Sequence, residues 1–128
     1  MLSRRSLLAA IAAVSVGAPA FAAAPVDYSP AAFDAALKSG KPVLVWIHAS
    51  WCPTCKAQAP TLARIEADPR YKDLTVVRVD FDSQKDAVKR FGARMQSTLI
   101  TFKDGKEVGR SVGETDPTAL TALVAKVV

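Results

Sequence analysis

VLVWIHASWCPTCKAQAP (residues 43–60) joins an unbroken apolar run to a helical pattern through the only two cysteines of the chain. Residues 41–48 consist of a Lys-Pro pair followed by this apolar run. It does not alternate with polar residues, and this predicts a strand buried on both faces. From residue 52 to residue 67 the pattern becomes helical, with Pro60 expected to bend the helix. The two cysteines therefore lie at the start of a helix that directly follows a buried strand.

Two thiols three positions apart at a helix N-terminus can divide the work of disulfide exchange. The free N–H groups and the partial positive charge of that terminus stabilise a thiolate at Cys52 and lower its pKa. Cys55, one turn further, is expected to be more covered and near enough to resolve a mixed disulfide. A static staple is disfavoured because so small a ring constrains the unfolded chain little. A closed structural zinc site needs four ligands, and the chain has two Cys and one His.

The remaining strands are indicated by two further segments. Residues 74–82 (LTVVRVDFD) predict a second long strand, and residues 97–102 and 106–113 predict two strands joined by Asp104-Gly105, a strong hairpin signal. Residues 26–28 are a candidate for a short extra strand. Strands that alternate with helices imply parallel pairing, and the hairpin adds an antiparallel edge.

The remaining helices are indicated by their first residues. Capping side chains followed by proline, or by an acidic residue three positions on, occur at Ser29-Pro30, Ser83 with Asp86, and Asp116-Pro117. We therefore expect an α/β fold with a central mixed sheet of four to five strands, flanked by helices and ending in the hairpin and a last helix.

The N-terminus has the three-part layout of an export signal. Arg4 and Arg5 precede an apolar run over residues 7–16, and Ala20-Phe21-Ala22 fits a small-x-small cleavage pattern. The run is too short for an ordinary transmembrane span, which needs about 20 apolar residues, so an uncleaved anchor is the disfavoured alternative. Because SRRSLL also resembles a twin-arginine signal, twin-arginine export and general secretion both remain open.

Cleavage after Ala22 divides the chain into a signal peptide over residues 1–22 and a domain over residues 23–128. The signal contains two arginines and no acidic residue, so the formal net charge of +5 falls to +3 in the mature domain. That modest excess does not indicate nucleic-acid binding, which needs a clustered basic stripe. Export predicts a periplasmic or secreted location, where disulfides persist.

The segment over residues 43–60 resembles the active-site region of thioredoxins and related thiol–disulfide oxidoreductases. Trp51 and Lys56 flank the cysteines as they do in that family, and Gly113 matches the glycine near its substrate groove. FGARMQSTLITFKDGKEV (residues 91–108) resembles the segment that leads into the family's hairpin. The resemblance runs through most of the mature chain and implies a thioredoxin fold with a protein-disulfide oxidoreductase site.

Three residues depart from the family's pattern. Thioredoxins nearly always have a cis-proline facing the cysteines, and this chain has Ser97 there. Trp46 replaces a buried acid that assists the resolving thiol, and His48 replaces a tryptophan. A cis bond before a residue other than proline costs about 2.5–4 kcal/mol, so the Gln96–Ser97 bond is expected to be trans. Ser97 then offers a backbone N–H and a hydroxyl that could bind a thiolate or approach a metal.

The resemblance also suggests roles for the surrounding side chains. Trp46 is expected in the core with the stem of Arg78 against it, and Met95 is expected to fill a gap in the core. His48 is either a partly buried ring bonded to a backbone carbonyl or a group that tunes Cys52. The expected substrate groove is bordered by Trp51, Pro53, Thr54, Ser97, Thr98 and Gly113, and the expected tuning residues are His48, Lys56, Trp46 and Arg78.

These features favour an exported, monomeric protein-disulfide oxidoreductase in which Cys52 attacks and Cys55 resolves. No cofactor is expected, the substrates are other exported proteins with disulfides or thiols, and electrons pass to or from a membrane redox partner. Reductase, oxidase and isomerase activities all remain open. One alternative is a metal-binding module in which Cys52 and Cys55, with His48 or Ser97, hold copper(I) or an iron–sulfur cluster shared between two chains. Another is a catalytically weak binding module.

Overall fold

The computed structural model describes residues 12–14 and 24–128 of the 128-residue chain. The expected signal peptide, its cleavage point and its twin-arginine pattern therefore fall outside the described residues, apart from residues 12–14. Within the described part of the chain, no helix has the length and apolar character needed to cross a membrane.

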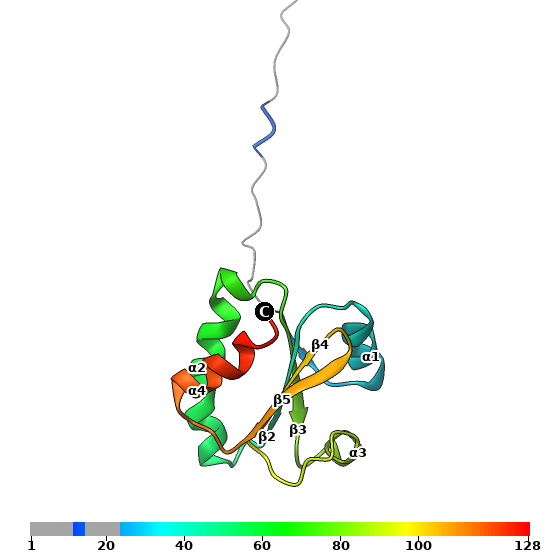
Figure 1. The fold of residues 1–128 in the computed structure, drawn as a ribbon, viewed down its shortest axis with the longest axis vertical. Coiled ribbons are helices and arrows are strands. Elements are labelled where there is room, and N and C mark those ends of the chain that lie inside the picture. Colours follow the sequence, from blue (N-terminus) through cyan, green and yellow to red (C-terminus); the bar gives the residue numbers. More distant parts are fainter. Residues whose placement is uncertain (1–11, 15–23) are drawn as a thin grey trace, which may run out of the picture.

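Five strands form one mixed sheet in the order β1-β3-β2-β4-β5 (Figure 1). Strands β1, β3 and β2 run parallel, and β4 is antiparallel to both β2 and β5. The bounds of the strands are β1 Ala24–Asp27, β2 Val43–His48, β3 Thr75–Asp80, β4 Thr98–Lys103 and β5 Lys106–Val112. The expected mixed sheet, its C-terminal hairpin and the extra N-terminal strand are therefore confirmed. At the hairpin turn, Asp104 and Gly105 both have positive φ, as tight hairpin turns of this kind require.

The helices begin where the sequence predicts, with one exception. Their bounds are α1 Pro30–Lys38, α2 Pro53–Ala67, the short 3-10 helix η1 Pro69–Tyr71, α3 Lys85–Arg90 and α4 Pro117–Ala125. Ser29 and Asp116 cap α1 and α4 through their side chains, as expected. The expected cap of α3 at Ser83 is wrong. The Asp80 carboxylate accepts the backbone N–H groups of Asp82 and Ser83 instead, and α3 begins one residue later without a side-chain cap.

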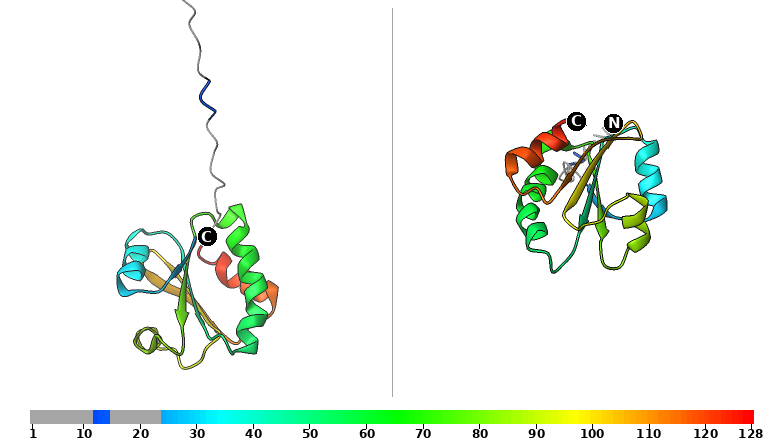
Figure 2. Two further views of the ribbon diagram at one scale, coloured as in Figure 1. Left: turned by 180° about the vertical axis from the view of Figure 1, so that it is seen from behind. Right: turned by 60° about the horizontal axis from the view of Figure 1, so that its bottom comes forward.

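Helices α1 and α3 cover one face of the sheet, and α2 and α4 cover the other (Figures 1 and 2). Strand β2 is buried on both faces, as its unbroken apolar run predicts. Its Val45 and Ile47 pack into the core under α1 and α3, whereas Leu44 and Trp46 pack into the core under α2 and α4. The second core also contains both cysteines, so the thiols lie at the end of β2, on the face of the sheet covered by α2 and α4.

Candidate active site

Cys52 is the N-cap residue of α2. Its backbone is extended, and its Sγ accepts a hydrogen bond from the backbone N–H of Cys55 at 3.1 Å. Pro53 occupies the first helical position, where a missing N–H does no harm. Both thiols are free, and their exposed fractions are 1% for Cys52 and 3% for Cys55. Both thiols are thus buried, and Ser97 contacts each sulfur. Their surface exposures do not separate them, and burial is the largest influence on the pKa of Cys55.

Ser97 lies against both sulfurs. Its Oγ is 3.1 Å from the Sγ of Cys52 and 3.3 Å from the Sγ of Cys55. No peptide bond in the described segments is cis, so the expected trans bond before Ser97 is confirmed. Only one of its two expected donors faces the thiols, because the backbone N–H of Ser97 donates to the carbonyl of Ile47 at 2.7 Å.

The backbone of Ser97 is held in an uncommon conformation. Its φ is +64°, in the left-handed region that residues with a side chain seldom adopt. Three hydrogen bonds hold it there. Its N–H donates to Ile47, and its carbonyl accepts from the N–H of Gly113 at 3.0 Å and from the side-chain amide of Gln58 at 3.1 Å. Residues in such conformations persist only where their surroundings fix them strongly, and they are concentrated at functional sites.

Gln58 is the site residue that the sequence analysis missed. It lies on α2, its side chain is fully buried, and its Oε1 accepts the indole N–H of Trp46 at 2.9 Å. Its Nε2 donates to the carbonyls of Ser97 at 3.1 Å and Glu114 at 2.9 Å. The signal available in the sequence was a polar residue at an inward position of α2, three residues after Cys55 and four before the buried Leu62.

The two thiols have opposite pKa shifts. Burial alone would raise the pKa of Cys52, but hydrogen bonds from the Cys55 thiol, the Ser97 hydroxyl and the Cys55 backbone outweigh it, and the pKa lies below the ordinary thiol value. Burial raises the pKa of Cys55, and the hydrogen bond between the two thiols raises it further. The favoured ionisation state is therefore a thiolate on Cys52 beside a neutral thiol on Cys55.

The residues expected to border a substrate groove divide into exposed and buried ones. Trp51 is 55% exposed, and its indole N–H donates to the Asp82 carboxylate at 2.7 Å. Pro53, Lys56 and Gly113 are exposed and Thr54 is half-buried, as positions around a groove allow. Thr98, however, is buried, and its hydroxyl donates to the backbone carbonyl of Met95. Its side chain is therefore not on a groove surface.

Met95 does not fill a gap in the core. Its side chain is 52% exposed, so the expectation from the sequence is wrong. The residue lies in the connection between α3 and β4, and the backbone there continues into the left-handed Ser97. Met95 is thus an exposed apolar side chain two residues from the serine that contacts both thiols.

The remaining tuning residues lie side by side at the end of β2 and on β3. Trp46 is buried, as expected, and its ring stacks on that of His48 with centroids 4.7 Å apart. Arg78 is the partner of Trp46 in the strand register, and its guanidinium pairs with Glu66 on α2 at 3.1 Å. Burial lowers the pKa of His48, the charge of Arg78 lowers it further, and nearby acids, chiefly Asp80, oppose the shift.

His48 is not assembled with the cysteines as a metal-binding set. Among residues 12–14 and 24–128, no group of three or more His, Cys, Asp or Glu side chains is arranged to hold a metal ion. The ring of His48 stacks on Trp46, and its charged neighbours are Asp80, Arg78 and Asp27. The ligand set of Cys52, Cys55 and His48 that the sequence suggested is therefore not brought together.

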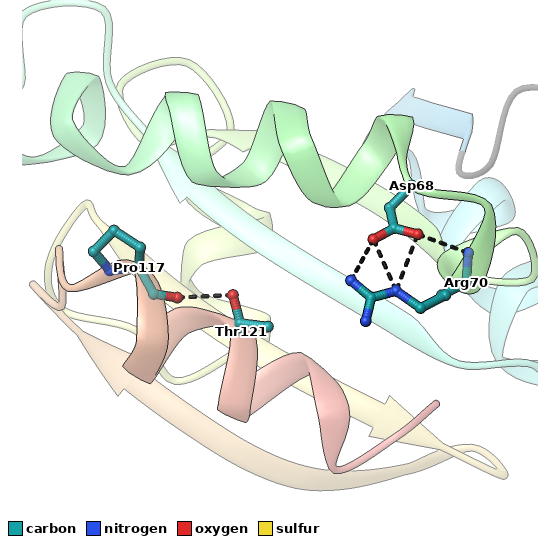
Figure 3. Close-up of polar contacts among 4 residues, drawn as sticks. All are labelled: Asp68, Arg70, Pro117 and Thr121. Atoms are coloured by element: carbon teal, nitrogen blue, oxygen red, sulfur yellow. Dashed lines mark hydrogen bonds and ion pairs between the residues drawn. The ribbon is translucent and has the colours of Figure 1, made fainter.

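Two surface hollows lie away from the thiols. One, of about 610 Å³, lies between α2 and α4. Figure 3 shows that polar groups around it already bind one another, since the Asp68 carboxylate accepts from Arg70 and the Thr121 hydroxyl donates to the Pro117 carbonyl at 2.7 Å. The other, of about 770 Å³, lies between the start of α3 and the residues that precede α1. Neither is lined by a cysteine, so it is the geometry of the thiols that locates the site.

Comparison with known proteins agrees with this geometry. The family model described as Thioredoxin matches residues 24–126. A thioredoxin of Mycobacterium tuberculosis is 44% identical over 92 residues, which are 72% of this chain and 78% of that protein. A thioredoxin of Chlamydia muridarum is 42% identical over 84 residues, 66% of this chain and 80% of its own length. The crystal structure of Trxlp from Edwardsiella tarda is 48% identical, with a TM-score of 0.77 over 79% of this chain and 98% of that one.

The matched region contains every strand and helix described above, and the paired thiols lie at its active-site helix. The chain therefore belongs to the thioredoxin family, and Cys52 and Cys55 are the thiol pair of a protein-disulfide oxidoreductase.

Proposed function

We propose that this protein is exported and exchanges disulfides with other exported proteins, with Cys52 as the attacking thiol and Cys55 as the resolving thiol. The observation that carries the assignment of roles is the difference between the two thiols. The pKa of Cys52 lies below the ordinary thiol value because hydrogen bonds outweigh burial, whereas burial raises that of Cys55. The thiolate is the nucleophile in such exchange, so the first attack belongs to Cys52.

The reaction proceeds through a mixed disulfide. The Cys52 thiolate attacks one sulfur of a substrate disulfide, and the other substrate sulfur leaves. Cys55 then attacks the Sγ of Cys52, the bond between Cys52 and the substrate breaks, and the second substrate sulfur leaves as a disulfide forms between the two cysteines. Run in reverse, the same steps oxidise a substrate dithiol, and the redox partner sets the direction.

Exposed apolar side chains next to the thiols support a polypeptide substrate. Trp51, which precedes Cys52, is 55% exposed, Met95 is 52% exposed, and Val112 is 58% exposed. Val112 is the register partner of Thr98, the residue after Ser97, so these exposed side chains come from three different segments of the chain. Apolar groups left exposed around a site are typical of surfaces that bind another chain. They suit an extended or unfolded segment that contains cysteine.

The proposal of export depends on the N-terminal sequence. Arg4 and Arg5, the apolar run after them and the small residues up to Ala22 form a signal peptide. The first strand begins at Ala24, just beyond the proposed cleavage point, which fits a domain that folds without the signal. We propose a periplasmic or secreted monomer that exchanges electrons with a membrane redox partner. Fractionation of cells expressing the full chain, with Arg4→Lys/Arg5→Lys as the twin-arginine test, checks the route.

Trapping and labelling test the roles of the thiols. Cys55→Ala should accumulate mixed disulfides with exported proteins, Cys52→Ala should trap few, and both should lose insulin reduction. In the reduced parent, iodoacetamide should label Cys52 before Cys55 at neutral pH, and the rate at Cys52 should reach half its maximum below pH of about 8.5, the free-thiol value. Faster labelling of Cys55 contradicts the assignment. Copper or iron bound at about one equivalent per chain would favour the metal-binding alternative.

A further inference from the structure

We propose that the Ser97 hydroxyl is a catalytic group of the resolving step, in which it carries the proton of Cys55 to the departing substrate sulfur. The inference rests on the disulfide exchange proposed above. It begins from a requirement of that reaction: Cys55 must lose its proton before or during its attack. Because burial and the neighbouring Cys52 raise its pKa, Cys55 is a neutral thiol near pH 7. Some group beside it has to take that proton.

The side chains around the site do not supply a free base. Trp46 occupies the position behind the thiols, and its indole N–H, which can only donate, is bonded to Gln58. Both ends of the Gln58 amide are already in hydrogen bonds with Trp46, Ser97 and Glu114. Each of these groups is therefore committed to another partner in the folded protein.

The charged groups on neighbouring elements are also engaged elsewhere. The carboxylate of Asp80 accepts two backbone N–H groups of the turn after β3, and Asp82 accepts the indole of Trp51. Glu114 accepts the backbone N–H groups of the two residues that follow it. His48 stacks on Trp46, Arg78 pairs with Glu66, and Lys56 is exposed on α2. The groups that act on the pKa of Cys55 are Cys52, Ser97 and the Ala49 backbone, besides burial itself.

The hydroxyl of Ser97 is in the right place for the transfer. Its Oγ is 3.1 Å from the sulfur of Cys52 and 3.3 Å from that of Cys55, and the side chain is buried away from competing water. A hydroxyl can donate one hydrogen bond and accept another at the same time. In the reduced protein the Cys52 thiolate accepts hydrogen bonds from the Cys55 thiol and the Ser97 hydroxyl. Once Cys52 is in a mixed disulfide its sulfur has lost that charge, and the Cys55 thiol can donate to Ser97.

The substrate sulfur is one bond beyond a sulfur that this hydroxyl contacts. A sulfur bonded to the Sγ of Cys52 is about 2 Å from it, and Ser97 Oγ is in contact with that Sγ. As Cys55 bonds to Cys52, the electron pair of the breaking bond goes to the substrate sulfur. The Cys55 proton passes to Ser97 Oγ, and the proton of Ser97 passes to the substrate sulfur. Ser97 ends as a neutral hydroxyl, and no further reactant is needed.

The fixed backbone explains why this serine can serve as a relay. Its N–H bond to Ile47 and the bonds to its carbonyl from Gly113 and Gln58 set the direction of its side chain. Gln58 thereby acts as a positioning residue, because it ties the carbonyl of Ser97 to the helix that carries both cysteines. A general acid–base group in such a position contributes roughly 10²–10⁴-fold to a proton-transfer step.

Two variants separate the hydroxyl from the backbone. Ser97→Ala and Ser97→Gly both lack the hydroxyl, but glycine adopts a φ of +64° without strain, whereas alanine does not. Each reduced protein is mixed with glutathione disulfide, quenched in acid at set times and analysed by mass for the glutathione adduct on Cys52. The rise of the adduct reports attack and its decay reports resolution. The control is Thr61→Val, which removes a buried hydroxyl from α2 away from the thiols.

Both Ser97 variants should resolve the adduct about 100-fold more slowly than the parent, while Thr61→Val resolves it at the parent rate. Resolution in the parent should be slower in D₂O than in H₂O, and this difference should vanish in both variants. The resolving rate of the variants should also rise more steeply with pH. The relay would be overturned if both variants resolved the adduct at the parent rate. It would also be overturned if Ser97→Gly did so and Ser97→Ala did not. Failure of the parent to form the adduct would instead contradict the proposed exchange reaction.

Discussion

The two faces of the sheet are built from different chemistry. Under α1 and α3 the core is aromatic and aliphatic, with the Phe33 ring edge-on to those of Phe91 and Phe102 at centroid distances of 4.9 and 5.3 Å. Under α2 and α4 the core contains both thiols, and beside them the polar side chains of Gln58 and Ser97 are buried. The first face depends on packing, whereas the second also has to satisfy polar groups, and the thiol chemistry is found only on the second.

This difference teaches how a reactive site is kept inside a small domain. Buried polar groups weaken a fold unless each finds a partner. On the α2 and α4 face the partners form a chain from the indole of Trp46 through Gln58 to the carbonyl of Ser97, whose hydroxyl meets the sulfurs. Changes on the first face should therefore alter stability alone, and changes on the second should alter stability and thiol reactivity together.

The largest loss of stability is expected from Phe33→Ala. Phe33 is buried among three aromatic rings, so its removal leaves a cavity and should lower the free energy of unfolding by about 3–5 kcal/mol. Urea denaturation measures the loss, with Phe33→Leu as a milder control. The alkylation rate of Cys52 in the folded variant should match that of the parent. A changed rate would show that the two faces are coupled through the sheet.

A smaller loss of stability, joined to a change in reactivity, is expected from Gln58→Met. Methionine fills a similar volume but leaves the indole N–H of Trp46 without its acceptor, which should lower the free energy of unfolding by about 1–3 kcal/mol. The Ser97 hydroxyl also loses part of its support, so the pH at which Cys52 alkylation is half-maximal should rise. Thr61→Val is the matched control on α2. A variant with lowered stability and an unchanged alkylation profile would make Gln58 a purely structural residue.

A pH-dependent effect is expected from His48→Leu. Burial lowers the pKa of His48, so the unfolded chain takes up a proton near pH 6.5 while the folded chain does not. Stability should therefore fall as the pH drops through about 6.5. Backbone N–H groups of Ser83 and Asp82 hold the pKa of Asp80 below its ordinary value, so its contribution to stability is lost only at a lower pH. Urea midpoints measured from pH 7.5 to 5.5 should decline less in His48→Leu than in the parent, and parallel declines would exclude His48 as the source.

The smallest effect on stability is expected from Asp82→Ala. The Asp82 carboxylate accepts the indole N–H of Trp51, but that ring is largely exposed and can bond water instead. The free energy of unfolding should change by no more than about 0.5 kcal/mol. The fluorescence of Trp51 should shift as its ring is released, and Asp82→Asn, which keeps an acceptor, serves as the control. A loss of stability comparable with that of Gln58→Met would mean that the hydrogen bond between Trp51 and Asp82 supports the fold as a buried one does.

Much of the fold follows from local patterns in the sequence. The buried run of β2, the cap-and-proline starts of α1 and α4, and the Asp104-Gly105 turn each depend on neighbouring residues, and all are confirmed. The placement of the cysteines at the start of α2 follows in the same way.

The details that failed depend on residues far apart in the chain. Gln58 gained its role from carbonyls 39 and 56 positions away, which no local pattern reveals. The N–H of Ser97 was expected to face the thiols, but a carbonyl of β2 takes it. The failed cap at Ser83 is the local exception, because Asp80, only three positions earlier, accepts the N–H groups of the same turn. Sequence reasoning therefore located the site and its nucleophile but not the hydrogen bonds that hold Ser97 against the thiols.

The left-handed backbone of Ser97 limits the mutational paths open to this protein. Proline requires a φ near −65° and has no N–H, whereas Ser97 has a φ of +64° and donates to Ile47. A single change to proline, the residue that the resemblance to thioredoxins led us to expect here, thus demands the opposite twist and leaves a buried carbonyl without its donor. Glycine fits either twist and is a passable intermediate. Replacing this serine by proline therefore requires such an intermediate or a rebuilt segment around it.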